Sequence, residues 1–201
     1  MTTSQPSEGR AAQLPTGLPV LTVPGLWSSG PLHWQTHWEA AHPDWRRVQQ
    51  ADWDEPEVEA WTAALDREVL ECPAPPLLLA HSLGCVTVAH WARRYATPPF
   101  TSTIAGAFLV APSDVEAPSY PKRTGGFAPV PLARLPFPSL LVISDDDEYV
   151  TIERARLFAE AWGSDLVSIG DAGHINGASG HGPWPEGLAL AVAFAARLGR
   201  S

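Results

Sequence analysis

The sequence has few cysteines, an excess of acidic over basic residues and no long hydrophobic run, and each property excludes a class of protein. Its 201 residues include only two cysteines, Cys72 and Cys85, too few for a disulfide framework, so both are expected to be reduced. The 13 lysines and arginines against 22 aspartates and glutamates give a net charge of −9. Nucleic acids and anionic membranes both require a basic surface, so neither is an expected partner. No apolar stretch approaches the roughly 18 residues of a membrane span.

The N-terminal segment lacks the apolar core that is found in signal peptides. Residues 1–17 are rich in serine, proline and glycine. We therefore expect a flexible tail over residues 1–17, a single domain over residues 18–201 and a cytoplasmic location. The hydrophobic content of 45% is typical of a globular protein, and the length corresponds to about one domain.

Short apolar runs alternate with amphipathic segments along the chain. The expected strands cover residues 19–23, 47–50, 77–81, 107–111, 140–144 and 166–169. The expected helices begin at Pro31 and Pro56, cover residues 85–95 and 184–198, and run from a cap at Thr151 to Trp162. This alternation predicts an α/β fold with a mostly parallel sheet and helices on both faces. Residues 112–137 contain six prolines and predict a long surface loop, which leaves no length for a large cap domain.

A strand-to-helix junction carries a serine motif, Ala80-His81-Ser82-Leu83-Gly84. The pattern G-x-S-x-G in this context is typical of the nucleophile elbow of α/β-hydrolases. The turn is so tight that the positions two before and two after the serine must be small. Gly84 meets this requirement, and Ala80 replaces the first glycine with a single methyl group. Ser82 is therefore the predicted nucleophile at a helix N-terminus; the alternative is an ordinary capping serine.

A nucleophilic serine requires a histidine base and an orienting carboxylate, which follow it in this chain order in the fold. His174 follows the expected strand 166–169 and is the predicted base, with the more distant His181 as the alternative. Three consecutive aspartates, 145–147, follow the expected strand 140–144. The carboxyl ends of parallel strands meet at one edge of the sheet, where such proteins bind their ligands. The residues alone leave the choice among the three aspartates open.

Acyl transfer also requires backbone N–H donors that stabilise the oxyanion. We expect one donor at Leu83, next to the nucleophile. The second is expected at Leu26, after Pro24-Gly25, where glycine would let the backbone approach a substrate. The alternative is that Pro24-Gly25 only ends the strand. Trp27 beside this loop either lines a pocket or belongs to the core.

Metal binding is not expected, and the predicted chemistry requires no cofactor. His33 and His37 have the spacing of half a zinc site, but Trp34 occupies the position of the glutamate in H-E-x-x-H and no third ligand is evident. We interpret these histidines as part of an exposed helix face. Three adjacent aspartates cannot all point at one cation. His81 and His90 are interpreted as packing residues.

These motifs together resemble the retinoblastoma-binding-protein-9-like serine hydrolases. The resemblance rests on residues 23–27 (VPGLW), residues 50–56 (QADWDEP), the elbow around Ser82, and Gly173-His174. It spans about residues 19–198. It implies a compact α/β-hydrolase fold, a Ser-His-Asp triad and esterase activity on small acyl esters.

The resemblance also bears on the acid of the triad. In such proteins the acid lies four positions before a proline, in a D-x-x-V-P stretch. Residues 147–151 (DEYVT) fit this pattern with Thr151 in place of the proline. The resemblance therefore favours Asp147, with Asp146 as the alternative.

The predicted function is hydrolysis of a small-molecule ester through an acyl-enzyme, by Ser82, His174 and Asp147. Two alternatives remain. The same residues would serve an acyltransferase or thioesterase, and a hydrolase scaffold can also act as a binding module, which would require a protein partner.

Overall fold

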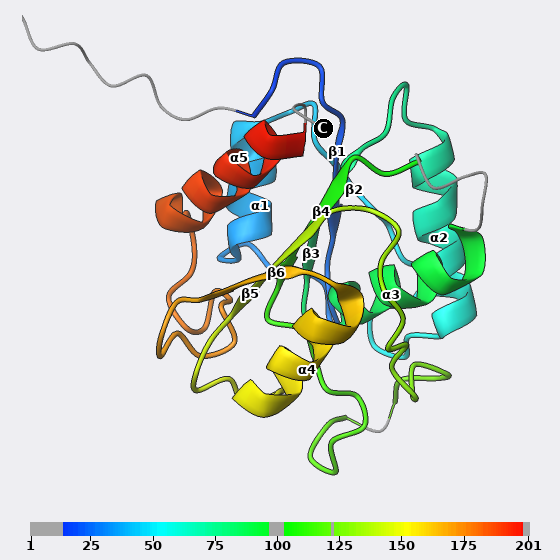
Figure 1. Cartoon of the computed structure of the whole chain (residues 1–201), viewed down its shortest axis with the longest axis vertical. Helices are drawn as coiled ribbons and strands as arrows, with labels where there is room; N and C mark the ends of the chain where they lie inside the picture. Colours follow the sequence, from blue (N-terminus) through cyan, green and yellow to red (C-terminus); the bar gives the residue numbers. More distant parts are fainter. Residues whose placement is uncertain (1–13, 97–102, 122, 199–201) are drawn as a thin grey trace, which may run out of the picture.

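The computed structural model describes residues 14–96, 103–121 and 123–198, which contain a six-stranded sheet (Figure 1). In chain order the strands are β1 (Val20–Val23), β2 (Arg46–Arg47), β3 (Leu77–His81), β4 (Gly106–Val110), β5 (Ser139–Ile143) and β6 (Asp165–Ser168). Their order across the sheet is β2-β1-β3-β4-β5-β6, and each of these pairings is parallel. The short, continuous apolar runs suit a parallel sheet because both of its faces are covered. The predicted α/β-hydrolase fold is confirmed.

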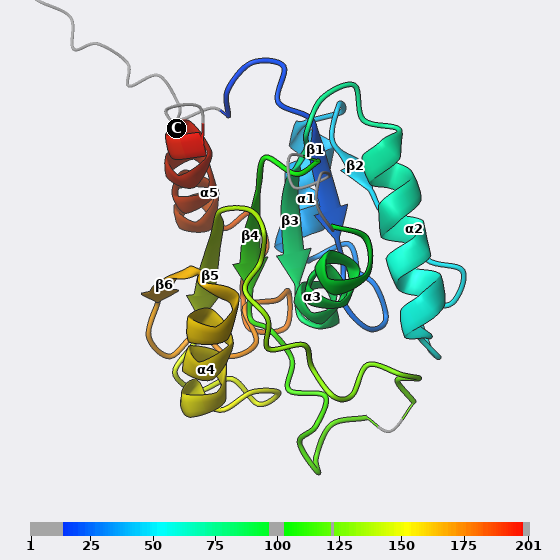
Figure 2. The ribbon, with the colours of Figure 1, turned by 45° about the vertical axis from the view of Figure 1, so that its right-hand side comes forward.

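Helices cover both faces of this sheet (Figures 1 and 2). The helices are α1 (Trp34–Ala41), α2 (Val58–Leu70), α3 (Leu83–Tyr95), α4 (Ile152–Trp162) and α5 (Pro185–Leu198). Alternate residues of β3 face opposite layers: Leu78 packs in a core with α2, α3 and α4, and Leu79 packs with α1 and α5. None of the helices in the described ranges is long and apolar enough to cross a membrane.

Both ends of α4 lie where the sequence predicted them. Thr151 is the N-cap, and its side chain accepts a hydrogen bond from the Arg154 N–H at 3.2 Å. Gly163 ends the helix in a left-handed conformation with φ 68°. Both caps are contacts within a few residues of the chain, so the local sequence is sufficient to predict them.

The start of α1 differs from the prediction. The helix begins at Trp34 rather than Pro31, and Ala41 on the predicted apolar face is exposed. His33 is the N-cap, because its Nδ1 accepts a hydrogen bond from the Gln35 N–H at 3.1 Å. Histidine is not among the preferred N-cap residues, so composition pointed to the proline instead.

The start of α2 also differs, for a tertiary reason. The helix begins at Val58, after Glu57, and not at Pro56. Gly125 donates its N–H to the Pro56 carbonyl at 2.8 Å and accepts the Val58 N–H at 2.9 Å. This pairing with the long loop holds the chain extended until Glu57, so the helix starts two residues later than predicted.

The remaining differences are small. The second strand is β2 (Arg46–Arg47) and not residues 47–50; the Val48 N–H still donates to the Thr22 carbonyl, after which no further strand pairing occurs. The described part of residues 112–137 contains no helix or strand, as predicted for a long loop. Of the predicted tail, residues 1–13 lie outside the described residues, so the domain boundaries stay a prediction. Both cysteines are free; Cys85 is buried and Cys72 half-buried.

Candidate active site

The chain turns sharply between β3 and α3 at Ser82. Its φ of 57° and ψ of −125° are unusual for a residue with a side chain and indicate backbone strain. An ideal Cβ at Gly84 would lie 2.1 Å from the Val23 carbonyl oxygen and 2.8 Å from that of Pro24, so no other residue fits there. The Ser82 N–H donates to the Val110 carbonyl at 3.0 Å. The strained turn is therefore held by β1 and β4, the two neighbours of β3.

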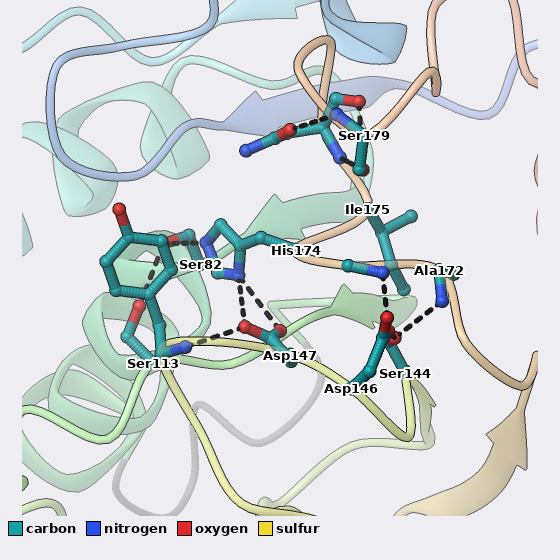
Figure 3. Close-up of polar contacts among 12 residues, drawn as sticks. Ser82, Ser113, Ser144, Asp146, Asp147, Ala172, His174, Ile175 and Ser179 are labelled. Atoms are coloured by element: carbon teal, nitrogen blue, oxygen red, sulfur yellow. Dashed lines mark hydrogen bonds and ion pairs between the residues drawn. The ribbon is translucent and has the colours of Figure 1, made fainter.

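His174 lies in the loop between β6 and α5, close to Ser82 (Figure 3). Its Nε2 is 2.9 Å from Ser82 Oγ, and the residue is only 6% exposed. The backbone on either side is left-handed, with φ 57° at Gly173 and 45° at Ile175. The two residues are 92 positions apart in the sequence. They meet because β3 and β6 both end at the same edge of the parallel sheet.

The aspartates after β5 point to different partners. Asp145 accepts a hydrogen bond from Ser168 Oγ at 2.7 Å. Asp146 accepts one from Ser144 Oγ and one from the Gly173 N–H, both at 2.7 Å (Figure 3). The hydrogen bond from Ser144 has the larger effect and that from Gly173 the smaller, and both lower the pKa of the Asp146 carboxyl group. Asp146 thus ties the end of β5 to the backbone that precedes the histidine.

Asp147 contacts the histidine ring itself. Both of its carboxylate oxygens lie 2.9 Å from His174 Nδ1, and its side chain is fully shielded from solvent. The Tyr149 N–H also donates to Asp147 Oδ1 at 2.9 Å. The structure therefore brings Ser82, His174 and Asp147 together, whereas the alternatives Asp145 and Asp146 form hydrogen bonds with groups other than the His174 ring.

A second serine, which the sequence analysis missed, contacts the first. Ser113 Oγ lies 2.8 Å from Ser82 Oγ, and Ser113 is completely buried. Tyr120 interacts with Ser113, and burial raises the pKa of Tyr120 to about 12. Both residues come from the long proline-rich loop, which has no periodicity that would have predicted their direction.

The expected oxyanion donors lie at the same site. Leu83 is the first residue of α3, so its N–H has no acceptor within the helix. An ideal Cβ at Gly25 would lie 3.0 Å from the Leu83 nitrogen and 3.0 Å from Ser82 Oγ, so any side chain at position 25 would fill the space in front of both atoms. The Leu26 N–H has no acceptor among the residues that the structure describes, although the Trp27 N–H donates to the Trp53 carbonyl.

A cavity of about 160 Å³ opens at these side chains. Trp27 lines it and is 57% exposed, so this tryptophan forms a wall and is not a core residue. The other lining residues come from the β1–α1 loop, the end of β3, the long loop, the β5–α4 loop and the histidine loop: Leu26, Ser28, His33, His81, Ser82, Tyr120, Pro121, Tyr149, His174 and Asn176. The lining combines aromatic rings with hydroxyl, imidazole and amide groups, which is typical of a small-molecule site.

The remaining histidines have different environments. His33 is buried and lines the cavity, which corrects the expectation of an exposed helix face. His37 is half-buried, and within the described ranges no three histidine, cysteine or acidic side chains gather as they would around a metal ion. His90 is buried and hydrogen-bonded to the Phe127 carbonyl, as expected of a packing residue. His181 lies near Ser179 and Trp184 and does not contact Ser82.

Known proteins place the chain in a family. A family model described as serine hydrolase matches residues 20–192. A YdeN-like hydrolase from Pectobacterium atrosepticum is 35% identical, with a TM-score of 0.77 over 90% of this chain and 92% of that one. The ydeN gene product of B. subtilis is 18% identical, with a TM-score of 0.72 over 88% of this chain and 98% of that one.

More distant structures share the fold. A thermophilic esterase from Thermogutta terrifontis is 18% identical, with a TM-score of 0.60 over 92% of this chain and 90% of that one. A monoacylglycerol lipase from Paleococcus ferrophilus is 16% identical, with a TM-score of 0.63 over 90% and 96%. No curated protein sequence matches the chain. Because the family model covers most of the described sequence, the chain belongs to the serine hydrolase family.

Proposed function

We propose that this serine hydrolase cleaves small carboxylic esters through a triad of Ser82, His174 and Asp147. The observation that carries the proposal is the pair of 2.9 Å contacts on opposite nitrogens of one imidazole ring, Nδ1 to Asp147 and Nε2 to Ser82. A carboxylate has no proton to donate, so Nδ1 carries the proton and donates it. The Nε2 lone pair is then free to accept the hydroxyl proton of Ser82.

The first half of the reaction forms an acyl-enzyme. Ser82 Oγ attacks the ester carbonyl carbon while its proton passes to His174 Nε2. Asp147 holds the ring in the required tautomer and stabilises the imidazolium. The imidazolium then gives its proton to the departing alkoxide, which leaves as the alcohol. General-base help of this kind contributes about 10²–10⁴ in rate.

The second half regenerates the enzyme. A water molecule gives its proton to His174 Nε2 and attacks the acyl carbon, and the acid leaves as Ser82 Oγ recovers its proton. In both halves the negative charge on the carbonyl oxygen would be stabilised by the N–H groups of Leu26 and Leu83, each of which would contribute about 10²–10³ in rate. The glycine at position 25 leaves room for that oxygen.

Two resemblances support the ester as substrate. The elbow and the Gly173-His174 pair resemble motifs of the retinoblastoma-binding-protein-9-like hydrolases. The Thermogutta protein is called an esterase and the Paleococcus protein a lipase. Both are hydrolases of carboxylic esters, and both share the fold with this chain.

Labelling with a fluorophosphonate probe tests the proposal directly. The expected result is one phosphonyl group on the peptide that contains Ser82, because only an activated serine attacks the probe at neutral pH. Mass spectrometry of the digested protein separates this peptide from the one that contains Ser113, the neighbouring serine. Absence of labelling, or labelling at Ser113 instead, would contradict the proposal.

The size of the cavity predicts a preference for short acyl groups. A cavity of about 160 Å³ is close to the roughly 150 Å³ of an engineered protein cavity that holds one benzene molecule. We expect kcat/KM for nitrophenyl esters to be highest for acetate to butyrate and to fall about tenfold or more by decanoate, because a chain too long for the cavity displaces the carbonyl carbon from Ser82, and a misplacement of about 1 Å can lower the rate about 10²-fold. A maximum at acyl chains beyond about ten carbons would contradict this.

Truncation of the exposed pocket wall tests the same point. Trp27→Ala should shift the preference toward longer acyl chains with little effect on stability, because the residue is 57% exposed. Leu70→Ala is the matched control: Leu70 is 73% exposed on α2 and does not line the cavity. The control should leave the chain-length profile unchanged.

A further inference from the structure

Two buried histidines in the cavity have no role in the mechanism above. His33 caps α1, and His81 is the last residue of β3, directly before Ser82. They are 7% and 5% exposed. His33 Nε2 lies 3.3 Å from His81 Nδ1, and His81 Nε2 lies 2.9 Å from the carbonyl oxygen of His174. The two rings thus connect the N-terminus of α1 to the backbone of the proposed catalytic base.

The direction of every hydrogen bond in this chain follows from its two ends. The Gln35 N–H can only donate, so His33 Nδ1 is an acceptor and the proton of a neutral His33 ring is on Nε2. His33 Nε2–H therefore donates to His81 Nδ1, which leaves the proton of His81 on Nε2. That N–H donates to the His174 carbonyl, which can only accept. Each donor has an acceptor when both rings are neutral.

A proton added to either ring would break the chain. It would go to His33 Nδ1, against the Gln35 N–H, or to His81 Nδ1, against the N–H of His33. The surroundings of the two rings also disfavour the positive charge that an added proton would bring. Burial, followed by the charge of Arg47, lowers the pKa of His33 to about 3. Burial, followed by the proximity of His33, lowers the pKa of His81 well below its usual value.

The segment that receives the last hydrogen bond is one where position matters. The left-handed residues on both sides of His174 are held by side chains from outside the loop. One backbone group in each of three consecutive residues is hydrogen-bonded to such a side chain. The Gly173 N–H donates to Asp146, the His174 carbonyl accepts from His81, and the Ile175 carbonyl accepts from Trp34 Nε1. The central anchor is the one on the histidine itself.

We propose that His33 and His81 are positioning residues, which form an uncharged hydrogen-bonded chain that holds the His174 backbone so that its ring reaches Ser82. The proposal rests on the function proposed above, since it assigns His174 as the base. A misplacement of about 1 Å in a reacting group reduces the rate about 10²-fold. Loss of the chain should therefore lower kcat and leave KM unchanged.

Two substitutions of His81 distinguish the effect of losing the hydrogen bond to the His174 carbonyl from the effect of a smaller side chain. The amide nitrogen of glutamine reaches about as far as Nε2, whereas that of asparagine reaches only as far as Nδ1. His81→Gln can keep the donor to the His174 carbonyl, and we expect kcat within about threefold of wild type. His81→Asn loses that donor, and we expect kcat to fall about 10–100-fold at constant KM. Equal kcat values for the two variants would overturn the proposal.

A substitution farther from the serine tests the first link. His33→Asn keeps a good N-cap for the Gln35 N–H but removes the donor to His81. We expect kcat to fall about 5–10-fold, with the helix retained. The double variant His33→Asn/His81→Asn should be no slower than His81→Asn alone, because both changes break one chain. Additive losses, or full kcat in His33→Asn, would overturn the chain.

His90→Asn is the matched control. His90 is 5% exposed, and its Nε2 also contacts a backbone carbonyl at 2.9 Å, that of Phe127. This variant should lose thermal stability and keep kcat, since Phe127 is not at the site. A loss of kcat as large as that of His81→Asn would show a general structural effect and overturn the proposal. Wild-type labelling at Ser82 separates the two hypotheses, because it tests the nucleophile independently of either histidine.

Discussion

Ser82→Ala is expected to abolish hydrolysis of short-chain nitrophenyl esters, with kcat reduced about 10⁶-fold, as on loss of the nucleophile in a serine protease. The hydroxyl oxygen is the only atom of residue 82 that can bond to the acyl carbon. The measurement is kcat for nitrophenyl acetate in purified wild type and variant, together with a thermal melt. The melting temperature should change little, because alanine keeps the Cβ in the strained turn and removes only one oxygen.

Ser139→Ala is the control for this experiment. Ser139 is also buried, at 4% exposure, but it begins β5 and therefore lies at the opposite edge of the sheet from Ser82. Its hydroxyl contacts Ser164 at 2.6 Å. This variant should keep its activity. Near-wild-type turnover in Ser82→Ala, with loss of turnover in Ser113→Ala, would move the nucleophile to the neighbouring serine.

Asp147→Asn is expected to lower kcat by up to about 10⁴-fold, by analogy with the loss of the acid from the triad of a serine protease. The amide at position 147 can donate a hydrogen bond to Nδ1, which favours the tautomer with its proton on Nε2. That tautomer has no lone pair facing Ser82, so it cannot take the hydroxyl proton. Little stability should be lost, because the amide oxygen can still accept the Tyr149 N–H.

The two neighbouring aspartates provide matched controls of the same chemistry. In Asp146→Asn the amide oxygen can still accept from Ser144 and Gly173, so we expect less than a tenfold loss. Asp145→Asn changes an exposed residue bonded to Ser168, and activity should be close to wild type. The three variants are compared in one ester assay. Full activity in Asp147→Asn combined with a large loss in Asp146→Asn would shift the triad by one residue.

Features set by contacts between near neighbours in the chain were predictable. The cap at Thr151 and the stop at Gly163 are local, and the structure has both. The pattern around Ser82 was recognisable as a short motif, although the demand for glycine at position 84 comes from the carbonyl oxygens of Val23 and Pro24, which are distant in the chain. The predicted starts of α1 and α2 were wrong because a histidine cap and a pairing with Gly125 override the preference of proline for the first turn of a helix.

The sequence by itself determined the order and type of the elements and the candidate residues that follow each strand, because these depend on short-range preferences and on which faces are apolar. The turn at Ser82 was recognisable from its motif, but contacts with β1 and β4 hold its strained backbone. Only the tertiary structure decided which side chains meet. In the structure, Asp147 contacts the His174 ring, and Asp146 accepts a hydrogen bond from the backbone beside it. Ser113 contacts Ser82, and His33 lines the cavity instead of lying on the surface. These outcomes depend on the direction in which each loop leaves its strand. That direction is set by contacts between segments tens of residues apart, which no local pattern encodes.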